Sequence, residues 1–147
     1  MIDEGTITRA IDTLLNASTI TATIERGTRI NFDPGRCPWI GIYPGNVQTK
    51  PKTLGLGSAR WNNTLEPQIV IQTASYDSDG QDASDELETL VSDVLAVIDA
   101  DLTLGVTGAR VIGVNREYRY VVFDDDGSGS LFMPQVVIKL QMEVRSA

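Results

Sequence analysis

The residues with the clearest chemical potential form an acidic, glycine-containing run at positions 124–130. An EF-hand calcium loop places oxygen ligands at loop positions 1, 3 and 5 and a sharp-turn glycine at position 6. Asp124, Asp126 and Ser128 occupy the three ligand positions and Gly129 occupies the sixth. If the run binds a cation, these three residues are its ligands.

Two features of the same run favour a β-hairpin loop instead. Position 12 of the loop pattern is Gln135, which has no bidentate carboxylate, and Pro134 lies where a flanking helix would begin. Acidic residues and glycines are also common in turns between two strands. We therefore predict a hairpin loop here and keep a calcium-dependent binding module as the alternative.

The remaining motifs each lack a residue that their chemistry requires. The run 77–82 has Asp82 where a calcium loop needs glycine, and the run 55–58 lacks both the third glycine of a dinucleotide site and the Gly-Lys-Ser/Thr of a P-loop. Asp99 and Asp101 form a carboxylate pair at the end of a predicted helix, where we expect solvated acids. None of these motifs predicts catalysis.

The chain contains no histidine, and Cys37 is its only cysteine. Imidazole is the usual general base near neutral pH and the commonest metal ligand, so histidine-dependent triads and zinc sites are excluded. One cysteine cannot form an intrachain disulfide, and we expect Cys37 to be a small packing residue. The sequence predicts no enzyme, no metal site and no cofactor.

Acidic residues are concentrated in the second half of the chain. The net charge is −8: residues 1–73 carry seven Lys/Arg and six Asp/Glu, whereas residues 74–147 carry five and fourteen. A surface of this sign repels phosphate backbones, so we expect no specific nucleic-acid binding. It suits either plain solubility or a wall that DNA passes without adhering. The apolar stretches are too short to span a membrane, and the acidic start does not resemble a secretory signal.

Two segments have the three- and four-residue spacing of amphipathic helices. The first is residues 3–16, whose apolar face carries Ile7, Ala10, Ile11, Leu14 and Leu15. The second is expected to begin around Ser84, whose hydroxyl would cap the first turn, with Asp85 and Glu86 at the positive end of the helix dipole. Its apolar positions are Leu87, Leu90, Val91, Val94, Leu95 and Ile98.

Alternation of apolar and polar residues predicts strands in the rest of the chain. A short apolar strand at 39–43 is expected to end at Pro44, and a later strand is expected to be interrupted by Pro67, which cannot donate a ladder hydrogen bond. The other predicted strand segments are 19–26, 69–71, 111–114, 117–123 and 136–145. Between them, residues 45–58 are expected to form a long projecting loop or hairpin arm.

The order of helix, strands, helix and strands predicts an α+β fold. Strands with one polar face favour an antiparallel or mixed sheet of about five strands, with two helices packed on one face. With 41% hydrophobic residues and no internal repeat or linker, residues 1–147 are expected to form one domain. We expect Trp39 to be buried. Trp61, beside Arg60 in a polar setting, is predicted either at a subunit interface or in the core.

This order of elements resembles the tail-terminator (tail-completion, minor tail protein U-like) family of tailed phages. The resemblance covers nearly the whole chain, and its most telling stretches are TRAIDTLL at 8–15, PWIGIYP at 38–44 and DELETL at 85–90. The family is defined by architecture and has no catalytic signature. The resemblance therefore carries no catalytic residue, metal ligand or cofactor to this chain.

The resemblance implies a structural virion protein that assembles in the host cytoplasm as a homo-oligomeric, hexameric ring. Such a ring caps the finished tail tube, ends its polymerisation and offers a docking face to the neck of the head, so its partners are the tail-tube protein and a head–neck connector. DNA would pass through the ring, and no membrane is involved. The residues expected in subunit or partner contacts are Lys50, Lys52, Arg60, Trp61, Asp124, Asp125 and Asp126. A different head–tail connector or neck protein is the alternative within the same class.

Overall fold

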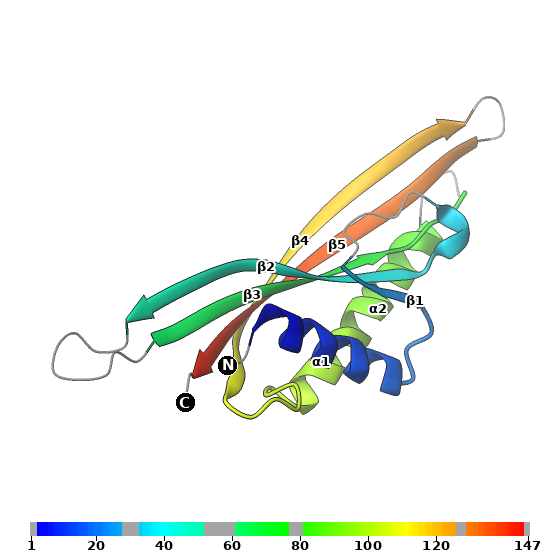
Figure 1. The fold of residues 1–147 in the computed structure, drawn as a ribbon. Coiled ribbons are helices and arrows are strands. Elements are labelled where there is room, and N and C mark those ends of the chain that lie inside the picture. Colours follow the sequence, from blue (N-terminus) through cyan, green and yellow to red (C-terminus); the bar gives the residue numbers. More distant parts are fainter. Residues whose placement is uncertain (1–2, 28–32, 52–60, 77–80, 126–128, 146–147) are drawn as a thin grey trace, which may run out of the picture.

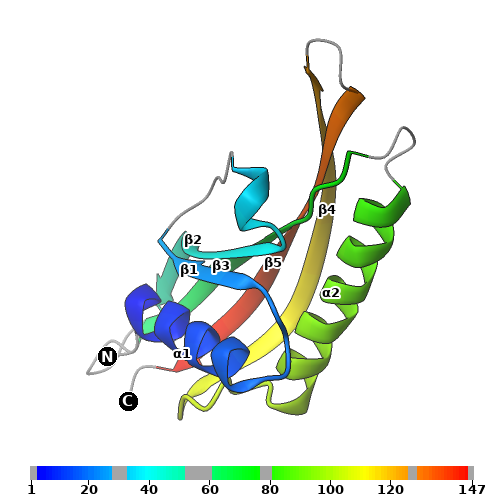
Figure 2. The same cartoon turned by 90° about the vertical axis from the view of Figure 1, so that its right-hand side faces the viewer.

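The structure is a computed structural model that describes residues 3–27, 33–51, 61–76, 81–125 and 129–145. Five strands form one mixed sheet in the order β1-β2-β3-β5-β4, and two helices cover one face of that sheet (Figures 1 and 2). The predicted α+β class is confirmed. The elements are α1 (Glu4–Ala17), β1 (Thr23–Arg26), the short 3-10 helix η1 (Pro34–Arg36), β2 (Trp39–Pro51), β3 (Trp61–Gln72), α2 (Gln81–Ala100), β4 (Ala109–Asp125) and β5 (Gly129–Arg145).

Side chains along each strand point alternately to the helix-covered face and to the outer face of the sheet. The main core lies between the helices and the helix-covered face of the sheet. Its helix residues include Ile7, Ile11 and Leu15 of α1 and Leu87, Val91 and Val94 of α2, which pack against apolar side chains of the strands. On the outer face a smaller cluster joins Trp39, Val70 and Val137, with Cys37 and Tyr43 packed against it. Trp39 is fully buried, as predicted, and Cys37 is the packing residue expected.

The first helix matches its prediction, and the second begins earlier than expected. Asp3 caps α1, because its carboxylate accepts a hydrogen bond of 2.7 Å from the Thr6 amide. Helix α2 begins at Gln81, so Ser84 lies inside the helix and the prediction that its hydroxyl caps the first turn is wrong. The hydroxyl of Thr73, from the end of β3, donates to the Ala83 carbonyl at 2.6 Å and ties this first turn to the sheet.

Pro44 does not end its strand, so that prediction is wrong, whereas the ladder is interrupted at Pro67 as predicted. β2 continues past Pro44 to Pro51, because a bulge between Tyr43 and Asn46 takes the proline out of the ladder. β3 also runs through Pro67, which falls at the same irregularity and leaves the pairing with β5 to resume at Gln68. The segment 45–58 therefore begins as a hairpin arm, with pairing continuing outward to Pro51 and Trp61.

The remaining strands differ from prediction mainly in length. β1 is confined to Thr23–Arg26, whereas β4 is one strand where two segments were predicted, because Asn115 and Arg116 between those segments pair with Lys139 and Ile138. β5 begins at Gly129, earlier than expected. Its pairing with β4 extends to Asp124 opposite Ser130 and Asp125 opposite Gly129, which confirms the predicted hairpin.

Candidate functional site

Two long hairpins leave the sheet in opposite directions, and they carry the residues predicted to make contacts (Figure 1). In the β2–β3 hairpin, Lys50 pairs with Asn62 and Pro51 pairs with Trp61 near the outer end. In the β4–β5 hairpin, Asp124 and Asp125 occupy the outer end of β4. The basic and acidic groups are therefore placed on two different arms.

Some of the predicted site residues lie outside the described part of the chain. Lys52 and Arg60 fall between β2 and β3, and Asp126 and Ser128 fall between β4 and β5. The interface role of Trp61 stays a prediction. Asp124 lies in a strand, where an EF-hand loop would be flanked by a helix. Among the described residues, no group of three or more His, Cys, Asp or Glu side chains is arranged to hold a metal ion.

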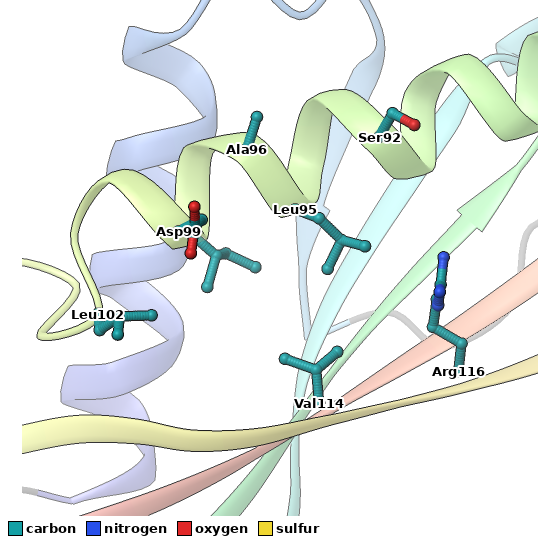
Figure 3. Close-up of a pocket in the computed structure, with 8 residues that line it drawn as sticks. Ser92, Leu95, Ala96, Asp99, Leu102, Val114 and Arg116 are labelled. Atoms are coloured by element: carbon teal, nitrogen blue, oxygen red, sulfur yellow. The ribbon is translucent and has the colours of Figure 1, made fainter.

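A groove of about 510 Å³ lies between α2 and β4, and sequence analysis did not predict it (Figure 3). Leu95, Ala96 and Asp99 line it from the helix, Leu102 lies at one end, and Val114 with Arg116 lines it from β4. The groove exists because α2 packs over β3 and β5, which leaves the helix-facing side chains of β4 beside the helix and not beneath it. Leu102 and Val114 are 41% and 45% exposed, which is high for apolar residues facing a core.

The helix side of the groove is strongly acidic. α2 carries six acidic residues and no basic one, and all six are exposed: Asp82, Asp85, Glu86, Glu88, Asp93 and Asp99. Beyond the helix, the hydroxyl and the amide of Thr103 both donate to Asp101 and hold the pKa of its carboxyl below the ordinary value. On the outer face of β4, Glu117 pairs with Arg119 at 3.2 Å and Lys139 at 3.7 Å. Negative charge is therefore concentrated along α2.

The opposite edge of the sheet has a different character. β1, η1 and β2 together carry three basic residues, Arg26, Arg36 and Lys50, and one acidic residue, Glu25. Glu25 is neutralised locally, because Arg36 pairs with its carboxylate and the Trp39 indole donates to it at 3.2 Å. Val47 of β2 is 41% exposed on this edge. The two edges of the sheet thus differ in both charge and shape.

The two arms, the groove and the acidic helix are features that favour binding between protein surfaces. The sequence indicated the two groups of charged residues on the arms. It did not indicate the groove, because that depends on strand order and on where α2 crosses the sheet. The available sequence signal was the complete lack of Lys and Arg in α2.

No protein-family model matches this sequence, and no curated protein matches it. Among solved structures, the chain is similar to one from the virion of a native gene transfer agent (GTA) particle, with a TM-score of 0.39 and 14% sequence identity over 95% of this chain and 96% of that chain. A TM-score at this level does not establish a common fold, so the functional proposal rests on the surfaces of this chain. No helix in the described residues is long and apolar enough to cross a membrane.

Proposed function

We propose that this chain is a structural protein of a tailed-phage virion that caps the tail tube as a ring of identical subunits. The ring, of six copies by analogy with the family that the sequence resembles, ends tube polymerisation and provides the docking face for the head. In this role the protein catalyses no reaction. It acts by presenting different surfaces to its own copies, to the tail-tube protein and to a connector of the neck.

The observation that carries the proposal is that two hairpin arms with different charged residues extend from one sheet in opposite directions. A closed ring requires each subunit to contact its two neighbours through two different patches, and stacking between two other rings requires two different faces. The β2–β3 arm has Lys50 near its end, and the β4–β5 arm has Asp124 and Asp125. Opposite charge on separate arms gives each contact a direction and disfavours self-association of like surfaces.

Removal of the protein from assembling particles tests the proposal. Electron microscopy should then show tail tubes of irregular length that lack a cap and remain separate from heads, and addition of the purified protein should restore tubes of uniform length. Capped tubes of normal length joined to heads would overturn the proposal. Capped tubes of normal length that fail only in joining heads would identify a neck connector instead.

A further inference from the structure

We infer that neighbouring copies of this chain join by strand addition, with the β2 edge of one copy pairing along the β4 edge of the next. This inference rests on the proposed ring and specifies its subunit contact. It follows from the two free edges of the sheet, the apolar residues beside them and the charges that flank them.

The first free edge belongs to β4, which ends the strand order. Its start is closed, because the Val111 amide donates to the Leu102 carbonyl at 2.8 Å. From Gly113 to Asp125 its inner side pairs with β5 without interruption, and in the described part of the chain no strand pairs with its outer side. The strand contains neither lysine nor proline, two of the residues that protect exposed edges from pairing, and its bulge lies before Gly113.

The second free edge belongs to the outer half of β2. β1 pairs only with residues 39–42 of β2, so in the described part of the chain no strand pairs with that side of β2 from Asn46 to Pro51. After the bulge, residues 46–51 form a regular ladder with β3 on the inner side. This six-residue segment is long enough to add to another sheet as a strand of typical length.

The two edges match in direction and in face. Successive antiparallel pairings from β2 through β3 and β5 to β4 make β2 and β4 antiparallel, so a neighbour in the same orientation offers β2 antiparallel to β4. Val47 lies opposite Leu65 and Val114 lies opposite Leu140, which places both valines on the helix-covered face. Strand addition would therefore bring exposed Val47 to the groove beside Val114 and remove both from water.

Charge selects this pairing over the pairing of two β4 edges. Two copies joined through β4 would bring two α2 helices near each other, each with six acidic residues and no basic one. The β2 edge has no acidic helix beside it, and in the described parts of β1, η1 and β2 the one acid, Glu25, is paired with Arg36, so pairing of unlike edges avoids this repulsion. A contact between unlike edges is also the kind that closes a ring.

Two substitutions, one on each edge, test the inference by measurement of mass in solution. Val47→Lys and Val114→Lys should each weaken ring assembly by roughly 100-fold, since each places a charge in an apolar contact. Each variant keeps one intact edge, so an equimolar mixture should form a dimer of twice the 16.0 kDa chain mass and nothing larger. Tyr76→Lys is the matched control, because Tyr76 is 63% exposed and follows the central strand β3. It should assemble like the unmodified protein.

Hydrogen exchange provides a second measurement that does not depend on a variant. Amides in 46–50 and 113–117 should both exchange at least about tenfold more slowly in the ring than in the Val114→Lys monomer. Rings formed by both variants, or unchanged exchange at both edges, would overturn strand addition and leave the proposed ring intact. Dimerisation of Val47→Lys alone would also overturn it, in favour of β4 self-pairing. Failure of the unmodified protein to assemble, alone or with tail-tube protein, would remove both proposals.

Discussion

Gly45 lies against the backbone carbonyl of Glu66 across the β2–β3 bulge, so that a Cβ atom at position 45 would be 1.8 Å from the carbonyl oxygen. No side chain fits there unless the two strands separate. We predict that Gly45→Ala destabilises the protein by about 2 kcal/mol or more, because backbone on a paired strand has little room to shift. Urea unfolding followed by circular dichroism would measure the loss.

The matched control is Gly5→Ala in α1. A Cβ atom there would be no closer than 3.4 Å to its neighbours, which are side-chain atoms of Arg9 and Asp3. Alanine is favoured over glycine in helices, so this substitution should leave stability unchanged or raise it by up to about 1 kcal/mol. Equal stability of the two alanine variants would show that the bulge does not require glycine.

The bulge also shows why the sequence predicted the fold class better than the strand lengths. Proline lacks the N–H that a strand ladder uses, so Pro44 and Pro67 each predict the end or interruption of a strand. Here both fall at the same irregularity of two neighbouring strands, where the ladder needs no N–H donor. The α1 face was predictable because a helix is stabilised by contacts three and four residues apart. The start of α2 was not predictable, because its first turn is fixed by a hydrogen bond from Thr73, which follows β3.

The candidate site also has one part that local sequence predicts and one part that depends on the tertiary fold. Lys50 and Asp124 could be assigned to projecting segments, since glycine, proline and charge mark a hairpin within a few residues. The groove between Leu95 and Val114 could not be assigned, because residues far apart in the chain meet there only through the order of the strands.

The Asp3 cap predicts a pH dependence for α1. The amide and the hydroxyl of Thr6 both donate to the Asp3 carboxylate and hold its pKa below the ordinary aspartate value. Because the pKa is lower in the folded state, the stabilisation is complete above the unfolded pKa and is lost as the pH falls through the folded pKa. Asp3→Ala should therefore lower Tm at neutral pH, and the difference from the unmodified protein should shrink in acid. A difference in Tm that is constant with pH would show that the charge does not contribute.

The β4–β5 pairing predicts that the acidic loop does not bind calcium as an EF-hand does. Asp124 and Asp125 are paired with Ser130 and Gly129 as strand residues, whereas an EF-hand holds its ligands between two helices. Calorimetry with calcium at near-physiological concentration should give no binding heat. Saturable heat that disappears in Asp124→Asn would restore the binding-module alternative and weaken the structural proposal.

The arm formed by β2 and β3 predicts how charge reversal changes assembly. Lys50 lies near the end of the paired region, and Lys52 follows it in the sequence beyond the described residues. Replacing both with glutamate puts like charges against an acidic neighbour, so ring formation or tube capping should weaken by roughly 100-fold or more at low salt, with a smaller loss when both are replaced with glutamine. Arg9→Glu, which replaces an exposed cation of α1, tests the effect of added negative charge away from the arm and should assemble normally. Sedimentation with tail-tube protein separates the outcomes: full capping by the double glutamate variant would show that the arm makes no essential contact, whereas equal failure of Arg9→Glu would attribute the loss to net charge and not to the arm.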